Sequence, residues 1–212
     1  MGSATSVDGI DDPTSDPRWN WTLGQTQFNW FKQTIQGSTA TYKFVFAHHM
    51  LGGMDPYVRG GAVPAHMFEW GGYNDDGTWG FDTQRPTFGD DPIHQLMIDN
   101  GVSAFFHGHD HQFVHEERDG IVYQLVPQPS VDGYGFDLYV DSPYVISGGN
   151  LPNSGHVRVT VSPGEATVEY VRSEATSGGI NGTVEYSYTV ESGHCATIYL
   201  PIILNSTTTI DP

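Results

Sequence analysis

Two short stretches decide the fold: K-F-V-F-A-H-H at residues 43–49 and V-S-A-F-F-H-G-H-D-H at residues 102–111. Each opens with the β-branched and aromatic residues that are typical of a buried strand, and each strand then runs directly into histidines. The order helix, strand, loop, helix, strand indicates parallel strands joined by helical crossovers. Because sites in such sheets form at the carboxyl ends of the strands, we expect both histidine clusters at one edge of a sheet.

Two helices are predicted, one before each strand. The first begins near Leu23, where Thr22 and Gln25 have the spacing of a capping box. The second begins with Asp91 as its cap and has Pro92 in its first turn. Between the first strand and the second helix lies a long loop, 50–90, rich in glycine and aromatic residues, which we expect to be ordered and functional.

From residue 112 onward the pattern changes to β. Asp119-Gly120 is a hairpin turn signal between 113–118 and 121–126. Three more segments alternate in the manner of half-buried strands, at 156–161, 166–172 and 183–190. A stretch rich in Ser and Gly near 173–182 predicts a boundary between a main domain, 1–172, and a β-rich extension or tail, 173–212. The fold class predicted is therefore α/β (α+β).

The histidine clusters indicate a metal site. Neutral imidazole is a good ligand for Zn, Fe and Mn, and an H-x-H pair that leaves a strand can hold one metal or two adjacent ones. His109 and His111 form such a pair, and His48 from the neighbouring strand end supplies a third imidazole. The alternative is that these side chains are hydrogen-bonded loop residues, which is the better interpretation for the isolated histidines elsewhere in the chain.

The composition and net charge of the chain limit the classes of partner that it can bind. Lys and Arg number 8 against 25 Asp and Glu, a formal charge of -17, so nucleic acid and anionic membranes are not expected as partners. The longest apolar run is far shorter than the ~20 residues of a membrane span. The single cysteine, Cys195, leaves the compartment open, while N-x-S/T sequons at Asn20, Asn181 and Asn205 favour an extracytoplasmic or secreted protein.

The two strand–histidine stretches resemble the last two metal motifs of the calcineurin-like metallophosphoesterases. In that family a strand ends in a ligand histidine and a later strand ends in G-H-x-H. The resemblance covers about residues 20–172 and implies the C-terminal part of a β-sandwich flanked by helices. It also implies a metal-dependent phosphoric ester hydrolase with two divalent ions in the intact domain, Mn, Fe or Zn. His48 and His109 would bind the second metal, and His111 the first.

Two further residues are candidates for contact with a phosphate-ester substrate. His49 follows His48 and could hydrogen-bond the phosphate or a metal ligand, although a supporting structural role is an equal alternative. Arg59 is one of only 8 basic residues and lies in the long loop, where it could donate two hydrogen bonds to phosphate; the alternative is a surface arginine.

The resemblance stops before the family's first motifs. D-x-H, G-D-x-x-D and G-N-H-D/E, which supply the bridging aspartate, the asparagine ligand and the general-acid histidine, do not occur upstream of His48. We therefore expect this chain to be a C-terminal portion of a larger enzyme, weak or inactive alone.

Two other classes of protein stay open. His109-x-His111 with Glu116 has the H-x-H-x4-E spacing of a cupin-like metalloprotein, a β-barrel. A non-catalytic, secreted, acidic β module that binds a metal or a partner would also fit the missing motifs. Neither the substrate nor the oligomeric state follows from the sequence.

Overall fold

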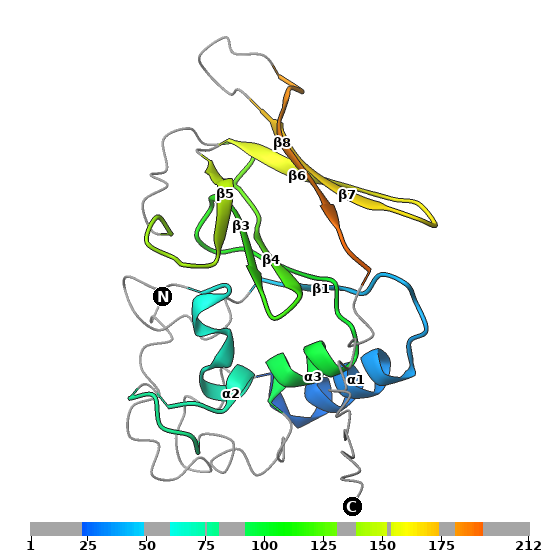
Figure 1. Ribbon diagram of the computed structural model, residues 1–212, viewed down its shortest axis with the longest axis vertical. Helices are drawn as coiled ribbons and strands as arrows, with labels where there is room; N and C mark the ends of the chain where they lie inside the picture. The colour runs from blue at the N-terminus through cyan, green and yellow to red at the C-terminus, as the bar shows by residue number, and fades with distance from the viewer. Residues whose placement is uncertain are drawn as a thin grey trace, which may run out of the picture.

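Two β-sheets form the centre of the molecule, which we describe from a computed structural model covering residues 23–48, 60–74, 76–80, 92–130, 139–151, 154–173 and 181–192 (Figure 1). The larger sheet has the strand order β1-β2-β4-β3-β5, and the smaller has the order β6-β7-β8. The larger sheet contains β1 (Phe44–Ala47), β2 (Ala104–His107), β3 (Phe113–Arg118), β4 (Ile121–Leu125) and β5 (Val145–Leu151). The smaller contains β6 (Gly155–Val161), β7 (Ala166–Arg172) and β8 (Val184–Val190).

Strand direction in the larger sheet is mixed. β1 pairs with β2 in parallel, and β2 pairs with β4 in parallel, which confirms the predicted mixed α/β sheet. β3 and β4 form the antiparallel hairpin that the Asp119-Gly120 turn predicts, and β5 pairs with the outer side of β3. The result is an open sheet flanked by helices, so the cupin-like barrel does not describe this chain.

Helices cover one face of the larger sheet. They are α1 (Gly24–Gly37), the short helices η2 (Val63–His66) and α2 (Phe68–Gly71), and α3 (Ile93–Asp99). α1 buries Phe28, Phe31 and Ile35, which recur at helical spacing. The predicted caps Thr22 and Asp91 lie outside the described residues. Leu23 is the N-cap of α1 and has no side-chain cap bond, and Gln25 donates to Asn29 one turn later at 2.7 Å. In α3 Pro92 is the N-cap residue rather than part of the first turn.

Successive side chains along a strand point to opposite faces of the sheet, so the larger sheet has a hydrophobic core on each face. Phe105 is fully buried and turns toward the helices, where its ring meets Trp70 edge-to-face at 5.7 Å between centroids. Its neighbour Phe106 turns the other way and packs with Val168 and Val190 of the smaller sheet. The chain therefore forms three layers, helices on sheet on sheet, with the smaller sheet on the side away from the helices (Figure 1).

β1 is the edge strand, and it is not the buried strand that the apolar run K-F-V-F-A predicts. Phe46 is 70% exposed and stacks on Phe106 at 4.9 Å. The residues of this run are apolar on both faces of the strand, which is the pattern of a strand in the middle of a sheet. Among the described residues, however, only β2 pairs with β1, and the sequence pattern does not indicate this edge position.

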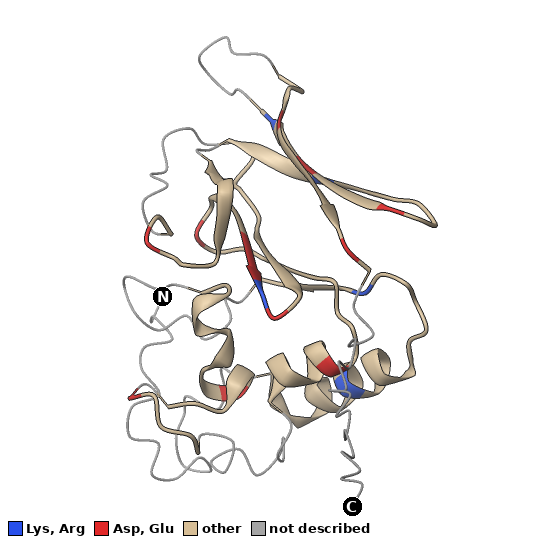
Figure 2. Ribbon diagram, in the orientation of Figure 1, with Lys and Arg blue, Asp and Glu red and all other residues tan. Residues whose placement is uncertain are grey.

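Acidic side chains are spread over the helices and both sheets, and basic ones are few (Figure 2). No helix within the described ranges has the length and apolar character needed to cross a membrane.

His115 joins the two sheets. It lies on β3 at a bulge in the pairing with β5, is 2% exposed, and stacks on Tyr188 of β8 at 3.7 Å between ring centroids. The Tyr188 hydroxyl donates to Gln124 of β4 at 2.7 Å, so β8 is bound to the larger sheet by stacking and by a hydrogen bond. Nε2 of His115 lies 3.2 Å from a Glu117 carboxylate oxygen but outside hydrogen-bond geometry.

We expect this junction to make stability depend on pH. Burial lowers the pKa of His115 to about 4, so between pH 6.5 and 4 the unfolded chain binds a proton there that the folded chain does not. Stability is then fully present above pH 6.5 and is lost as the pH falls, by on the order of 3 kcal/mol from this residue. Urea unfolding at several pH values should show a shallower acid loss for His115→Phe than for the wild type. His156→Gln, at an exposed position on β6, is the matched control and keeps the wild-type loss; equal slopes for all three proteins would contradict this account.

Candidate metal centre

The paired strands β1 and β2 bring the two histidine clusters to one edge of the larger sheet. Ala47 lies opposite His107 in the parallel register, so both strands end at the same level. His48 follows the end of β1, and His109 lies two residues beyond the end of β2. The imidazoles of His48 and His109 are in edge-to-face contact, with 5.7 Å between their centroids and 70° between their planes.

Gly108 allows this approach. A Cβ atom built at this position would lie 3.1 Å from Nδ1 of His48 and 3.5 Å from its Cε1. The contact at 3.1 Å is tight, so a side chain at this position would require the His48 ring to shift by a few tenths of an ångström. The glycine of the H-G-H sequence thus leaves the space in which two imidazoles from different strands can meet.

The backbone after Gly108 is strained. His109 and His111 have φ of 86° and 62°, in the left-handed region that non-glycine residues rarely adopt. Such outliers cost ~1–3 kcal/mol each and concentrate at functional sites. Asp110 between them is nearly buried and accepts a hydrogen bond from the Tyr139 hydroxyl at 2.8 Å, while the His111 carbonyl accepts one from the Gln128 amide at 3.3 Å. These contacts hold the turn in its strained form.

The histidines at this edge of the sheet provide part of the ligand set of a divalent transition metal. Two imidazoles side by side are suitable first ligands for Zn, Mn or Fe. Within the described ranges, however, no group of three or more His, Cys, Asp or Glu side chains could hold a metal ion. Metal binding by His48, His109 and His111 therefore stays a prediction. Of these three residues, His48 and His109 are in contact. His49 and Arg59 lie outside the described residues.

Gly61, near the start of the next described range, approaches the larger sheet at Glu116 and His107. Gly61 has φ of 78°, and a Cβ there would lie 2.0 Å from Oε2 of Glu116 and 3.6 Å from Nε2 of His107, so only glycine fits. Glu116 is fully buried, and its carboxylate accepts hydrogen bonds from the Ala62 amide at 3.1 Å and the Ser142 hydroxyl at 2.6 Å. Burial raises the pKa of Glu116, and it lowers that of His107 to about 3.

Sequence reasoning missed a second polar cluster at the opposite end of the sheet. His66, His94, Arg118 and Asp119 converge there, although the two histidines are isolated in sequence and Asp119 indicates only a turn. Nothing in their spacing indicates this contact, because it depends on how η2, α3 and the β3–β4 hairpin pack.

Comparison with known proteins relates the chain to solved structures only. No protein-family model matches the chain, and no curated protein matches it. It is similar to GAP50, the anchor in the inner membrane complex of Plasmodium, at 13% identity with a TM-score of 0.51, over 82% of this chain and 47% of that one. It is also similar to the purple acid phosphatase PPD1 from yellow lupin (Lupinus luteus) seeds, at 15% identity with a TM-score of 0.49, over 81% of this chain and 29% of that one.

The likeness concerns the fold alone. The chain is a mixed α/β structure dominated by sheets, and it matches part of the GAP50 structure. The chain spans less than half the length of either of these two structures.

We expect Gly108→Ala to weaken metal binding by roughly tenfold, because the added methyl group displaces the His48 ring from His109. Zinc affinity measured by competition with a chromophoric chelator tests this. Gly164→Ala in the β6–β7 turn is the matched control, since a Cβ there meets nothing within 4 Å. Equal zinc affinities for the two variants would show that the contact between His48 and His109 has no part in binding a metal.

Proposed function

We propose that this chain is the histidine-bearing part of a metal-dependent phosphoesterase. The observation that carries the proposal is the contact between His48 and His109, made by residues that follow two adjacent parallel strands. His111, two residues further along the strained turn, is the third proposed ligand. The purple acid phosphatase-like fold supports a phosphoesterase family.

In this proposal the histidines hold divalent metal without adding negative charge, which suits a substrate that is itself an anion. A bound metal supplies a Lewis acid that polarises a phosphoryl oxygen and lowers the pKa of a water near it. The formal charge of -17 makes local cations necessary, because the protein as a whole repels phosphate.

The roles proposed for His49 and Arg59 are to contact the phosphate. His49 adjoins His48 in sequence and would donate a hydrogen bond to a phosphoryl oxygen. Arg59 precedes Gly61 by two residues, and Gly61 packs beside His107, which itself precedes His109 by two. In this proposal the Arg59 guanidinium grips two phosphate oxygens at once. The buried Glu116 binds the backbone at Ala62 and would position that loop.

A non-catalytic role is the competing proposal. It is favoured by the lack of a three-ligand group among the described residues and by a likeness to a structure named as an anchor. In that case the chain would hold a metal or a partner without turnover, and the strained turn would serve binding alone.

Activity assays separate these proposals. We expect the longer protein of which this chain would form the C-terminal part to hydrolyse a phosphomonoester or phosphodiester with Mn, Zn or Fe, and to lose the activity with a chelator. His109→Ala and His111→Ala should each reduce kcat/KM by about a hundredfold or more, because each removes a metal ligand. His156→Ala, at an exposed position on β6, is the matched control.

The 212-residue chain alone should be weak. It lacks the motif for a general-acid histidine, and the loss of such a group typically costs ~10²–10⁴ in rate. Full turnover by this chain, unchanged in the two histidine variants, would contradict both the site and the expected role of upstream residues. Absence of activity in the longer protein would favour the non-catalytic proposal.

A further inference from the structure

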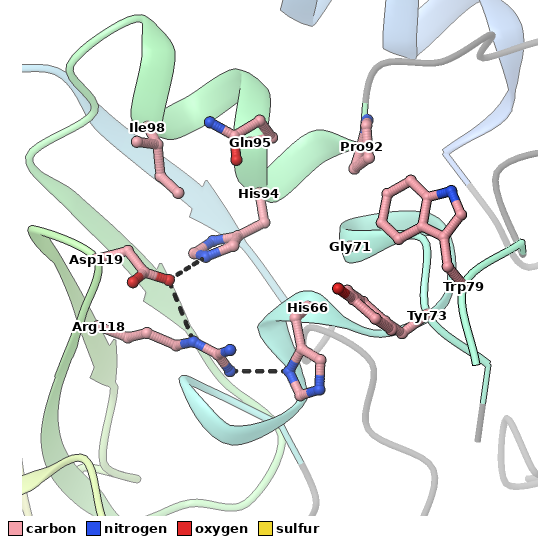
Figure 3. A pocket seen from close by; sticks show the side chains of 10 residues that line it. All are labelled: His66, Gly71, Tyr73, Trp79, Pro92, His94, Gln95, Ile98, Arg118 and Asp119. Atoms are coloured by element: carbon pink, nitrogen blue, oxygen red, sulfur yellow. Dashed lines mark hydrogen bonds and ion pairs between the residues drawn. The ribbon is translucent and has the colours of Figure 1, made fainter. Parts of the chain in front are cut away.

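A pocket of about 550 Å³ lies at the end of the larger sheet away from the candidate metal centre. Its described walls come from η2, from the end of α2 and the segment after it that carries Tyr73 and Trp79, from Pro92 and α3, and from the β3–β4 turn (Figure 3). That turn precedes β4, whose Val122 pairs with Ala104 at the start of β2, whereas His109 follows the other end of β2. The pocket is therefore separate from the candidate metal centre, and its volume is in the range of small-molecule sites.

A chain of hydrogen bonds builds one wall. The Tyr123 hydroxyl donates to Nδ1 of His94 at 2.5 Å, and Nε2 of His94 donates to the Asp119 carboxylate at 2.9 Å. Nε of Arg118 donates to the same carboxylate oxygen at 3.2 Å. Both nitrogens of His94 are thus occupied, so this residue orders the wall rather than binding a metal.

Arg118 is fixed on several sides. Its Nη1 donates to the carbonyls of Ala62 and Val63 and to Nδ1 of His66, at 2.7, 2.9 and 2.9 Å. Its guanidinium also lies over the Tyr144 ring, 4.9 Å from the centroid. The wall is preorganised, because the Arg118 side chain is held through Nε and Nη1 and the His94 ring through both of its nitrogens.

The wall carries little net charge. The positive charge of Arg118 is paired with Asp119, and burial lowers the pKa of both His66 and His94, which keeps these rings neutral at neutral pH. With a formal charge of -17 on the whole chain, an anionic ligand is disfavoured. An uncharged ligand with strong dipoles suits this pocket better than an ion.

Aromatic rings form the facing wall. Tyr73 stands between His66 and Trp79, with edge-to-face contacts at 5.4 and 5.0 Å between centroids. Trp79 lies on Gly72, where a Cβ would meet its ring at 2.7 Å, and backbone bridges tie Tyr73 to Met67 and to Trp79. Trp79 is nevertheless 53% exposed, so much of a rigidly held indole is open to a ligand.

Three polar groups on the lining residues have no hydrogen-bond partner among the described residues: the Tyr73 hydroxyl, the Gln95 amide oxygen and Nη2 of Arg118. Figure 3 shows the hydroxyl directed into the space between His66 and His94, and the Gln95 oxygen directed toward His94. The pocket therefore offers hydrogen-bond donors and an acceptor next to an aromatic surface.

We propose that this pocket binds an uncharged, planar heterocycle in which a ring N–H adjoins a carbonyl, as in uracil and guanine. The carbonyl would accept hydrogen bonds from Nη2 of Arg118 and from the Tyr73 hydroxyl. The N–H would donate to the Gln95 oxygen, and the ring would stack on Trp79. The proposal is independent of phosphoesterase activity, since the two sites lie at opposite ends of the sheet.

Calorimetric titration of the full chain with uridine and with guanosine tests the proposal. At least one of them should bind at a single saturable site. Trp79→Ala should weaken that binding by about five- to a hundredfold through loss of stacking, and Tyr73→Phe by about two- to tenfold through loss of one hydrogen bond. Trp30→Ala on α1, where the indole is 62% exposed and lies outside the pocket lining, is the matched control and leaves binding unchanged.

A methylated ligand tests the hydrogen-bonding edge directly. Methylation of the ring N–H, in 3-methyluridine or 1-methylguanosine, should abolish the binding, because the added methyl group removes the donor and meets Gln95. The proposal is overturned if neither nucleoside saturates at millimolar concentration. It is also overturned if the methylated nucleosides bind equally well, or if Trp79→Ala binds like Trp30→Ala.

Discussion

Backbone pairing between β1 and β2 is the constraint on which the candidate metal centre depends. The parallel ladder sets Ala47 opposite His107, and this register determines that His48 and His109 leave the sheet at the same level. A one-residue slip would turn Phe105 and Phe106 to the wrong faces and would cost both cores, so packing fixes the register. The imidazole contact is therefore a consequence of how the sheet buries its apolar side chains.

The same sheet separates two different chemistries. At the carboxyl ends of β1 and β2, Gly108 and the strained turn at His109 and His111 bring imidazoles together in a setting suited to a cation. At the β3–β4 turn, Arg118 and Asp119 cancel one another and leave a neutral, dipolar pocket lined by aromatic rings. A strongly acidic protein can contain both sites, because the charge at each site is set by the residues that line it.

The sequence predicts features that depend on local patterns. The spacing of Phe28, Phe31 and Ile35 predicts α1, and Asp119-Gly120 predicts the hairpin. β5 is not predicted, because V-I-S-G-G-N-L has no alternation, and Gly149 is required opposite His115, where a Cβ would lie 3.0 Å from the His115 Cβ. The exposure of Phe46 and the pocket network around Arg118 depend on tertiary packing, which no local pattern encodes.

The X-ray absorption spectrum of the zinc-loaded chain tests most directly whether strand-end histidines bind a metal. The account predicts imidazole scattering with Zn–N distances of about 2.0–2.1 Å, and one imidazole fewer in His48→Ala and in His109→Ala. Since these residues follow different strands, loss from both variants would show that the parallel register assembles the ligands. A zinc shell without imidazole, or the same shell in the wild type and both variants, would contradict the account.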